Sequence, residues 1–181
     1  MTIVTKADLV DHLNGGNQVR YLFFWGHQEQ KNEVTKSCLS QWYDSPFESN
    51  GVHFATAEHY MMYHKAILFG DALSADKALK APNPGKAKAI GRRVKGFTEK
   101  TWEKERFEIV VNANLAKFGN NGKLRQFLLN TGNRVLVEAS PVDKIWGVGM
   151  SSDNPAIENP NLWKGLNLLG FALMLVRDRL T

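Results

Sequence analysis

Helical periodicity is the main feature of the hydrophobic pattern along the chain. In several segments apolar residues recur three and four positions apart, which is the spacing of one helix face. Most of these segments follow a residue that can cap a helix, or end near a glycine. The predicted helices span residues 5–13, 57–69, 72–79, 84–96, 100–117, 120–130 and 166–180.

Shorter runs of β-branched and aromatic residues predict strands. The run at 19–25 is dense and bounded by glycines, which suits a buried strand. Asn50 and Gly51 predict a hairpin turn, because both residues adopt positive φ readily. The polar segment 26–36 lacks periodicity and predicts a mobile loop. The predicted extended segments are 19–25, 39–43, 134–138 and 144–148.

The order of these elements indicates the fold class. Strands early in the chain, helices in the middle and strands again before a last helix predict the α+β class. The chain has 181 residues, of which 43% are hydrophobic, and no stretch has the composition of a linker. We therefore predict one compact domain, residues 1–181, that is mostly helical with a small β-sheet.

The charge balance favours anionic ligands. Lys and Arg total 23 against 18 Asp and Glu, which gives a formal charge of +5 and a pI near 9.3. The basic residues are scattered, and the densest group is Arg92, Arg93 and Lys95. Because this group lies among helical segments, we interpret it as a solvated face rather than a nucleic-acid groove.

Cysteine usage and the N-terminus indicate the compartment. A single cysteine, Cys38, excludes an intrachain disulfide and fits a reducing compartment, so we expect a cytoplasmic location. Cys38 lies in an apolar stretch, which favours a small buried residue over a catalytic thiol. Residues 1–14 carry acids and lack a long apolar run, which predicts neither a signal peptide nor a membrane partner.

The first segment with unusual chemistry is Thr56 to Ala66. Glu58 and Lys65 are seven positions apart and therefore share a helix face. The carboxylate can simply complement the helix dipole or join a capping pair with Thr56, although the spacing is one residue short of a capping box. Alternatively, Glu58 is a partly buried acid or base whose pKa is set by aromatic surroundings.

The second segment is Ser140 to Met150, which holds an acid, a tryptophan and two glycines. Gly147 and Gly149 allow a ligand to approach the backbone, and Trp146 can form a flat wall for a base. Alone, Asp143 and Trp146 can also be a turn with an anchoring aromatic residue. Together with Glu58, Asp143 completes the two carboxylates that glycoside hydrolysis needs.

Other common chemistries lack their motifs in this sequence. His59 and His64 are five apart, no Cys-x-x-Cys occurs, and we expect no metal and no other cofactor. Phosphate-binding glycine loops and a serine nucleophile elbow are absent too. His27 is either a ligand or base, or a solvated loop histidine.

Five ordered motifs stand out along nearly the whole chain. They are Phe23-Phe24-Trp25-Gly26-His27, Cys38-Leu39-Ser40-Gln41-Trp42-Tyr43 with Ser45-Pro46-Phe47, Thr56 to Ala66, Trp146-Gly147-Val148-Gly149, and Trp163-Lys164-Gly165-Leu166-Asn167-Leu168-Leu169-Gly170. Together these motifs resemble the NADAR family. Its members include YbiA-like N-glycosidases, which act on early riboflavin-pathway intermediates, and enzymes that remove ADP-ribose from guanine bases.

The resemblance implies a compact YbiA-like α+β fold, no metal, and hydrolysis of an N-glycosidic bond at the anomeric carbon of a phosphorylated ribose. The segment around Trp25 is similar to the guanine branch, which implies ADP-ribosylated guanine, in DNA, RNA or a nucleotide, as substrate; ribosylaminopyrimidine phosphates are the alternative. The candidate catalytic residues are Glu58, Asp143 and Lys65. The candidate substrate-binding residues are Trp25, Gly26, His27, Met62, Trp146, Gly147, Trp163, Gly165 and Asn167.

The roles follow as hypotheses. Glu58 orients the sugar or activates water, Asp143 stabilises positive charge at the anomeric carbon, and Trp146 or Trp163 stacks on the substrate. Lys65 either holds a phosphate or attacks the anomeric carbon to give an imine. Two rival functions are a module that binds ADP-ribose or NAD without cleaving it, and a nucleic-acid-binding protein suggested by the basic pI.

Overall fold

The computed structural model describes residues 3–28 and 33–181, which fold into two compact units. Residues 1–40 and 123–181 form the first unit, and residues 41–122 form the second unit. The fold class is α+β and mainly helical, as predicted. The predicted small sheet is present as two separate two-stranded sheets, one in each unit. The prediction of one domain over 1–181 stays a prediction.

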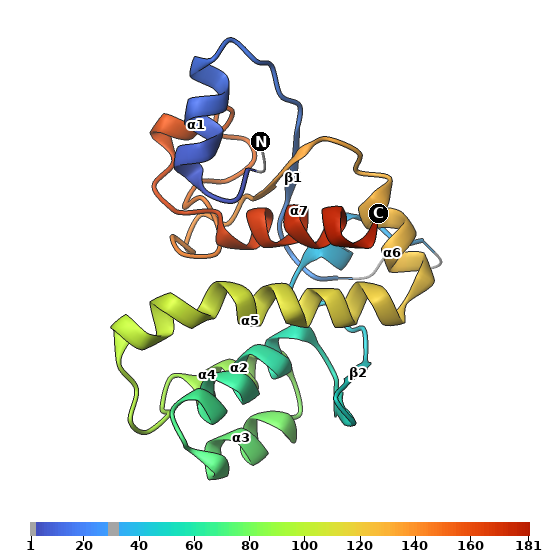
Figure 1. The fold of residues 1–181 in the computed structure, drawn as a ribbon, viewed down its shortest axis with the longest axis vertical. Coiled ribbons are helices and arrows are strands. Elements are labelled where there is room, and N and C mark those ends of the chain that lie inside the picture. Colours follow the sequence, from blue (N-terminus) through green and yellow to red (C-terminus); the bar gives the residue numbers. More distant parts are fainter. Residues whose placement is uncertain (1–2, 29–32) are drawn as a thin grey trace. The chain divides into compact units, whose positions relative to one another are not determined.

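The first unit is built on a parallel pair of strands covered by a helix (Figure 1). Tyr21 pairs with Val135 in register, and helix α7 packs on strand β4. Thr5 begins α1 with a capping box that includes Asp8. The elements are α1 (Lys6–Asn14), β1 (Tyr21–Phe24), η1 (Lys36–Leu39), α6 (Gly122–Leu129), β4 (Val135–Glu138), η2 (Pro160–Leu162) and α7 (Leu168–Leu180), the first residue of α6 belonging to the second unit.

The second unit is a cluster of helices with a hairpin. Helix α2 packs against α3, α4 and α5, and the hairpin turn has φ of 50° at Asn50 and 75° at Gly51, as predicted. Gly91 of α4 lies so close to Met62 of α2 that a methyl group there would overlap the thioether. The elements are β2 (Phe47–Ser49), β3 (Val52–Phe54), α2 (Ala57–Leu68), α3 (Ala72–Leu79), α4 (Pro84–Gly91) and α5 (Glu99–Asn120).

Two predicted strands are wrong. Residue 39 ends a short 3-10 helix, Lys36–Leu39, which Thr35 caps, and residues 40–43 form bends and turns with no ladder. Residues 144–148 form an irregular loop, because the carbonyls of Lys144 and Gly147 accept hydrogen bonds from residues 166 and 167. In both cases the backbone hydrogen bonds are made mainly with turns, helix ends and loops, and the single bond from the Val148 N–H to the Glu138 carbonyl oxygen does not make a ladder.

Other predictions concern single residues or whole segments. Cys38 is completely buried, as predicted. In the loop predicted at 26–36, residues 29–32 lie outside the described residues. No helix in the described part of the chain is both long and apolar enough to cross a membrane.

Candidate functional site

Glu58 lies in the first turn of α2 and is 2% exposed. Its backbone N–H donates to the Gln41 carbonyl oxygen at 3.0 Å. Thr56 caps the helix, since its hydroxyl oxygen accepts from the His59 N–H and lies 2.8 Å from His59 Nδ1. The capping-box interpretation therefore does not apply to Glu58, whereas a favourable interaction with the helix dipole does.

Lys65 lies two turns further along the same helix. Its ammonium nitrogen is 4.2 Å from the centroid of the Phe97 ring and 5.1 Å from that of Trp102. Burial lowers the pKa of Lys65, an effect that the carboxylates of Glu99 and Glu58 partly oppose. A lowered pKa increases the fraction of neutral amine, which is the form that can act as a nucleophile.

Gln41 and Asn114 form a buried amide pair, and neither residue was a candidate on sequence grounds. Asn114 Nδ2 donates to the Val110 carbonyl oxygen and to Gln41 Oε1, both at 2.8 Å. A carbonyl oxygen can only accept, so the contact with Val110 identifies the Asn114 amide atom there as the nitrogen. The same nitrogen must face an acceptor on Gln41, which fixes the orientation of the Gln41 amide.

The same pair leaves one donor group without a partner. Gln41 is 6% exposed, and its Nε2 has no hydrogen-bond partner within residues 3–28 and 33–181. Gln41 is also the residue whose carbonyl binds the Glu58 N–H. The second unit therefore places an unsatisfied amide donor beside the turn that carries Glu58, and such a group is costly unless a ligand or water accepts from it.

Asp143 organises a loop of the first unit with one of its carboxylate oxygens. Oδ1 accepts hydrogen bonds from the backbone N–H groups of Ile145 at 2.9 Å and Trp146 at 2.8 Å. The Asp143 N–H donates to the Ser140 hydroxyl oxygen at 3.1 Å. Oδ2 has no hydrogen bond to any described residue, and Asp143 is partly exposed, so this oxygen can act on a ligand.

Close backbone contacts join the Asp143 loop to the segment before α7. The N–H of Asn167 donates to the Gly147 carbonyl oxygen at 3.1 Å, and a side chain on Gly165 would overlap the same oxygen. Gly147 itself is confined, because a methyl group there would lie 2.8 Å from the Glu138 carbonyl oxygen. The two motifs thus form one loop structure that needs glycine at both positions.

Asn167 and Trp163 have structural partners within the first unit. Asn167 is completely buried with φ of 55°; its Nδ2 donates to the Leu136 carbonyl oxygen and its Oδ1 accepts from the Glu138 N–H, both at 2.9 Å. Trp163 is 4% exposed, and its indole N–H donates to the Ile157 carbonyl oxygen at 2.6 Å. Substrate contact by either side chain stays a prediction.

The remaining candidates differ in exposure. Trp25 is 60% exposed directly after β1, and Gly26 has φ of 84°. His27 is exposed and Trp146 is partly exposed, whereas Met62 is 5% exposed and packs against Gly91. The indole of Trp25 is thus available for contact with a substrate, and its role as a substrate-binding residue stays a prediction.

The structure gathers the candidates into two groups. Glu58, Met62 and Lys65 share α2 in the second unit, and the Asp143 loop with Gly165 and Asn167 belongs to the first unit. Because Glu58 and Asp143 lie in different units, their meeting around one substrate stays a prediction. Among the described residues, no three His, Cys, Asp or Glu side chains form a group that could hold a metal.

Comparisons with known proteins agree on one family. Residues 23–181 match the model of the NADAR domain. The chain is 43% identical to N-glycosidase R617 of Acanthamoeba polyphaga mimivirus, over 88% of this chain and 95% of that protein. It is 35% identical to the chloroplastic riboflavin biosynthesis protein PYRR of Zea mays, over 74% of this chain and 21% of that protein. The NMR structure of E. coli YbiA has a TM-score of 0.72 and 26% identity, covering 91% of this chain and 86% of YbiA.

Proposed function

This chain belongs to the NADAR family and is a hydrolase that acts on N-glycosyl bonds, and we propose that it removes ADP-ribose from ADP-ribosylated guanine. The observation that carries the proposal is the carboxylate of Glu58, which is 2% exposed in the first turn of α2 and shares a helix face with Lys65. The choice of guanine rests on the resemblance of the Trp25-Gly26-His27 segment to the guanine branch of the family.

In the first form of the mechanism, water attacks directly. Glu58 removes a proton from a water molecule, whose oxygen bonds to the anomeric carbon of the ribose as the carbon–nitrogen bond breaks. The electron pair of that bond passes to the guanine, which then takes up a proton. The free Oδ2 of Asp143 stabilises the positive charge that develops on the sugar, and Trp146 or Trp163 stacks on the substrate.

In the second form, Lys65 is the nucleophile. Its neutral amine bonds to the anomeric carbon, the guanine leaves with the bond electrons, and the sugar ring opens to give an imine. Water then hydrolyses the imine and restores the amine. The lowered pKa of Lys65 favours this form, because more of the amine is neutral near pH 7 than in an ordinary lysine.

The substrate is tested with two sets of compounds. The purified protein is incubated with an oligonucleotide that carries ADP-ribose on guanine and, separately, with ribosylaminopyrimidine phosphates, and the products are identified by mass spectrometry. Release of ADP-ribose from the first set supports the proposal. Cleavage of the second set alone would contradict it and favour the alternative that the maize relative suggests, a glycosidase of riboflavin-pathway intermediates.

Borohydride trapping distinguishes the two forms of the mechanism. Reduction during turnover fixes an imine as a stable adduct on a lysine, which direct water attack cannot produce. If Lys65 is the nucleophile, Lys65→Arg is inactive and gives no adduct, because a guanidinium remains protonated. If Lys65 only holds a phosphate, Lys65→Arg keeps most of the activity and the wild-type protein gives no adduct.

A binding module that does not cleave its ligand is the second candidate function. Glu58→Gln and Asp143→Asn keep the shape of each side chain and remove its charge. For an enzyme, we expect each variant to retain ADP-ribose binding while turnover falls about 100-fold or more. The exposed Glu48→Gln on strand β2 is the matched control and keeps full activity. Binding without product release by the wild-type protein would instead indicate the module.

A further inference from the structure

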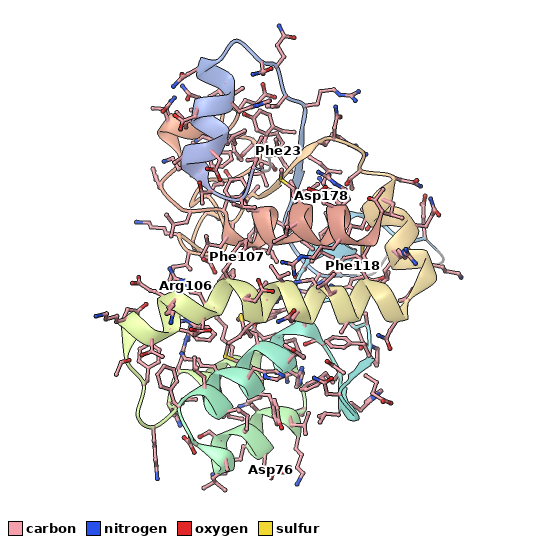
Figure 2. All side chains as sticks on the ribbon, in the orientation of Figure 1. Phe23, Asp76, Arg106, Phe107, Phe118 and Asp178 are labelled. Carbon is pink, nitrogen blue, oxygen red and sulfur yellow. The ribbon has the colours of Figure 1, made fainter. Side chains whose placement is uncertain are left out.

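The second unit contains a groove between α3 and α4 that lies outside the candidate site. Its volume is about 520 Å³. Four basic side chains and one acid line it, together with four small or apolar residues. The lining residues are Asp76, Lys77, Lys80, Ala81, Pro82, Lys86, Ala89, Ile90 and Arg93. Asp76 is labelled on α3 in Figure 2, and we call this cavity the α3–α4 groove.

The groove lies in the most basic part of the chain. Residues 71–95 contain seven Lys or Arg and two Asp, so this segment alone has the formal excess of +5 that the whole chain has. The sequence alone favoured a solvated face for Arg92, Arg93 and Lys95. Arg93 is exposed, and it also lines a concave surface, where cations raise the local potential more than on a convex one.

Acidic side chains neutralise little of this charge. Asp76 pairs with Lys80 at 2.7 Å. Asp71 is 8% exposed, and it accepts hydrogen bonds from the backbone N–H groups of Ser74 and Lys95. Its carboxylate therefore caps α3 and holds the segment after α4, and it does not pair with a cation of the groove. Three of the groove cations, Lys77, Lys86 and Arg93, are exposed and make no ion pair with a described residue.

The apolar part of the lining distinguishes the ligand of the groove from a free phosphate ion. Ala81, Pro82, Ala89 and Ile90 add apolar surface to the lining beside the four basic side chains. A nucleic-acid strand complements a lining that is both basic and apolar, because its anionic phosphates alternate with sugars and bases that can contact apolar surface. In a single strand the bases are unpaired and their faces can lie on an apolar surface, whereas in a duplex they are stacked on each other.

A chain of hydrogen bonds connects the groove to the turn that carries Glu58. Ala81, which lines the groove, has its carbonyl oxygen 3.0 Å from Nε2 of His59. The other ring nitrogen of His59 lies 2.8 Å from the Thr56 hydroxyl oxygen, and His59 directly follows Glu58. The wall of the groove is therefore attached to the first turn of α2.

We propose that the α3–α4 groove binds the phosphate backbone of a single-stranded nucleic acid next to its modified base. The proposal rests on the proposed function, and it makes the substrate a guanine within a strand rather than a free nucleotide. Lys77, Lys86 and Arg93 contact successive phosphates, and the apolar residues of the lining contact the sugars and bases between them. These contacts add affinity for the strand without touching the bond that is cleaved.

Binding is tested with the full-length protein and an unmodified single-stranded DNA of about 12 nucleotides, by fluorescence anisotropy over a range of salt concentrations. The test variant is K77E/K86E/R93E. The matched control, K100E/K104E/K123E, makes the same change in net charge at three exposed lysines outside the groove. Far-UV circular dichroism verifies that both variants are folded, and K77Q/K86Q/R93Q repeats the test without reversing charge.

We expect the groove variant to lose about 10-fold or more in affinity and its salt slope to fall by about 2, since each phosphate contact on a single strand contributes about 0.7. The control should stay within about 3-fold of the wild type. Equal losses in both variants would overturn the proposal, because they would reflect net charge alone. Binding to phosphatidylserine vesicles without binding to the DNA would overturn it too.

Turnover separates this inference from the proposed function. Cleavage is measured on a free guanine nucleotide that carries ADP-ribose on its base and on an oligonucleotide that contains the same ADP-ribosylated guanine. We expect the groove variant to lose kcat/KM for the oligonucleotide only. If the groove variant and the control variant have equal kcat/KM for the oligonucleotide, the proposed role of the groove in binding the strand is refuted. If the wild-type protein cleaves neither compound, the proposed function fails, while loss of DNA binding in the groove variant alone would still support the groove.

Discussion

At the scale of single residues, Gln41 is the group whose environment most clearly requires a partner. Its Oε1 is occupied by Asn114, which leaves the Nε2 donor buried and without a partner in the described structure. If the substrate supplies an oxygen there, Gln41→Met removes that hydrogen bond together with the one that Asn114 Nδ2 donates to Oε1, whereas Gln41→Glu removes only the first. A hydrogen bond to a neutral or charged oxygen contributes about 0.5–3 kcal/mol, so we expect kcat/KM to fall about 3-fold to about 100-fold.

The test compares Gln41 with a residue of the same type elsewhere. Gln41→Met and Gln41→Glu are assayed for kcat and KM, with the exposed Gln18→Met as control. Gln41→Glu should be the more damaging change, because it puts an acceptor where the donor was. Unchanged kinetics in both Gln41 variants would show that water, and not the substrate, accepts from Nε2.

His64 gives a prediction about stability and pH. Its ring centroid lies 4.1 Å from that of Tyr60, and burial lowers its pKa below the ordinary value of 6.5. As the pH falls below 6.5, the unfolded chain therefore takes up a proton that the folded protein does not. The contribution of His64 to the free energy of unfolding must therefore decrease as the pH falls from 6.5 to the pKa of the folded state, and it does not change further at lower pH.

The contribution of His64 is measured by chemical denaturation at several values between about pH 7 and about pH 5. His64→Phe keeps an aromatic ring and removes the titration, so its stability should fall less than that of the wild-type protein. The exposed His53→Phe should retain the wild-type pH dependence. Parallel curves for the wild type and His64→Phe would show that other groups cause the acid destabilisation.

Which site residues could be predicted depends on how each signals itself in the sequence. Glu58 and Asp143 could be selected as candidates because a carboxylate in an apolar helix or beside a tryptophan is unusual. Gln41 was missed because its segment has the composition of a strand. Asn114 did carry a signal, since it is a polar residue at a buried position of α5, but only the structure shows that its partner is Gln41.

At the scale of elements, local signals were sufficient where the chain satisfies its own backbone. Helix α2 begins after Thr56 and α4 begins at Pro84, as predicted, because caps and prolines act within one turn. The strand predicted at 144–148 was wrong for the opposite reason. The backbone partners of this segment are residues 166–169 and Glu138, and the pattern of five residues cannot indicate partners so distant in the sequence.

The packing of α7 on β4 predicts opposite effects for one substitution in two helices. Alanine is normally better than glycine inside a helix by about 1 kcal/mol. At Gly170, however, the added methyl group would overlap the Leu136 carbonyl oxygen, which belongs to the strand and cannot move freely. We expect Gly170→Ala to lower the free energy of unfolding by about 1–3 kcal/mol.

The matched control is Gly119→Ala in α5. No atom lies within 4 Å of the position that its methyl group would take, so this variant should be more stable by about 0.5–1 kcal/mol. Both values are measured by urea denaturation. Stabilisation of the protein by Gly170→Ala would mean that Gly170 and the Leu136 carbonyl oxygen leave room for a methyl group, and it would contradict this close packing of α7 on β4.

At the scale of the whole molecule, the path of the chain matters more than any motif. Tyr21 pairs in parallel with Val135, so the sheet of the first unit joins segments that the entire second unit separates. The chain passes between units at residues 40–41 and 122–123, and the second of these positions lies inside α6. Neither passage has the composition of a flexible linker, which is why we expect the units to unfold together.

Cooperative unfolding can be tested with the tryptophans, because both units contain them. Trp42 and Trp102 belong to the second unit, so in W42F/W102F the fluorescence reports on the first unit alone. Far-UV circular dichroism of the same variant reports on the helices of both units. We expect the two signals to have the same urea midpoint, as a two-state transition requires. A fluorescence midpoint that differs from the circular dichroism midpoint would instead divide residues 1–181 into two domains that unfold separately.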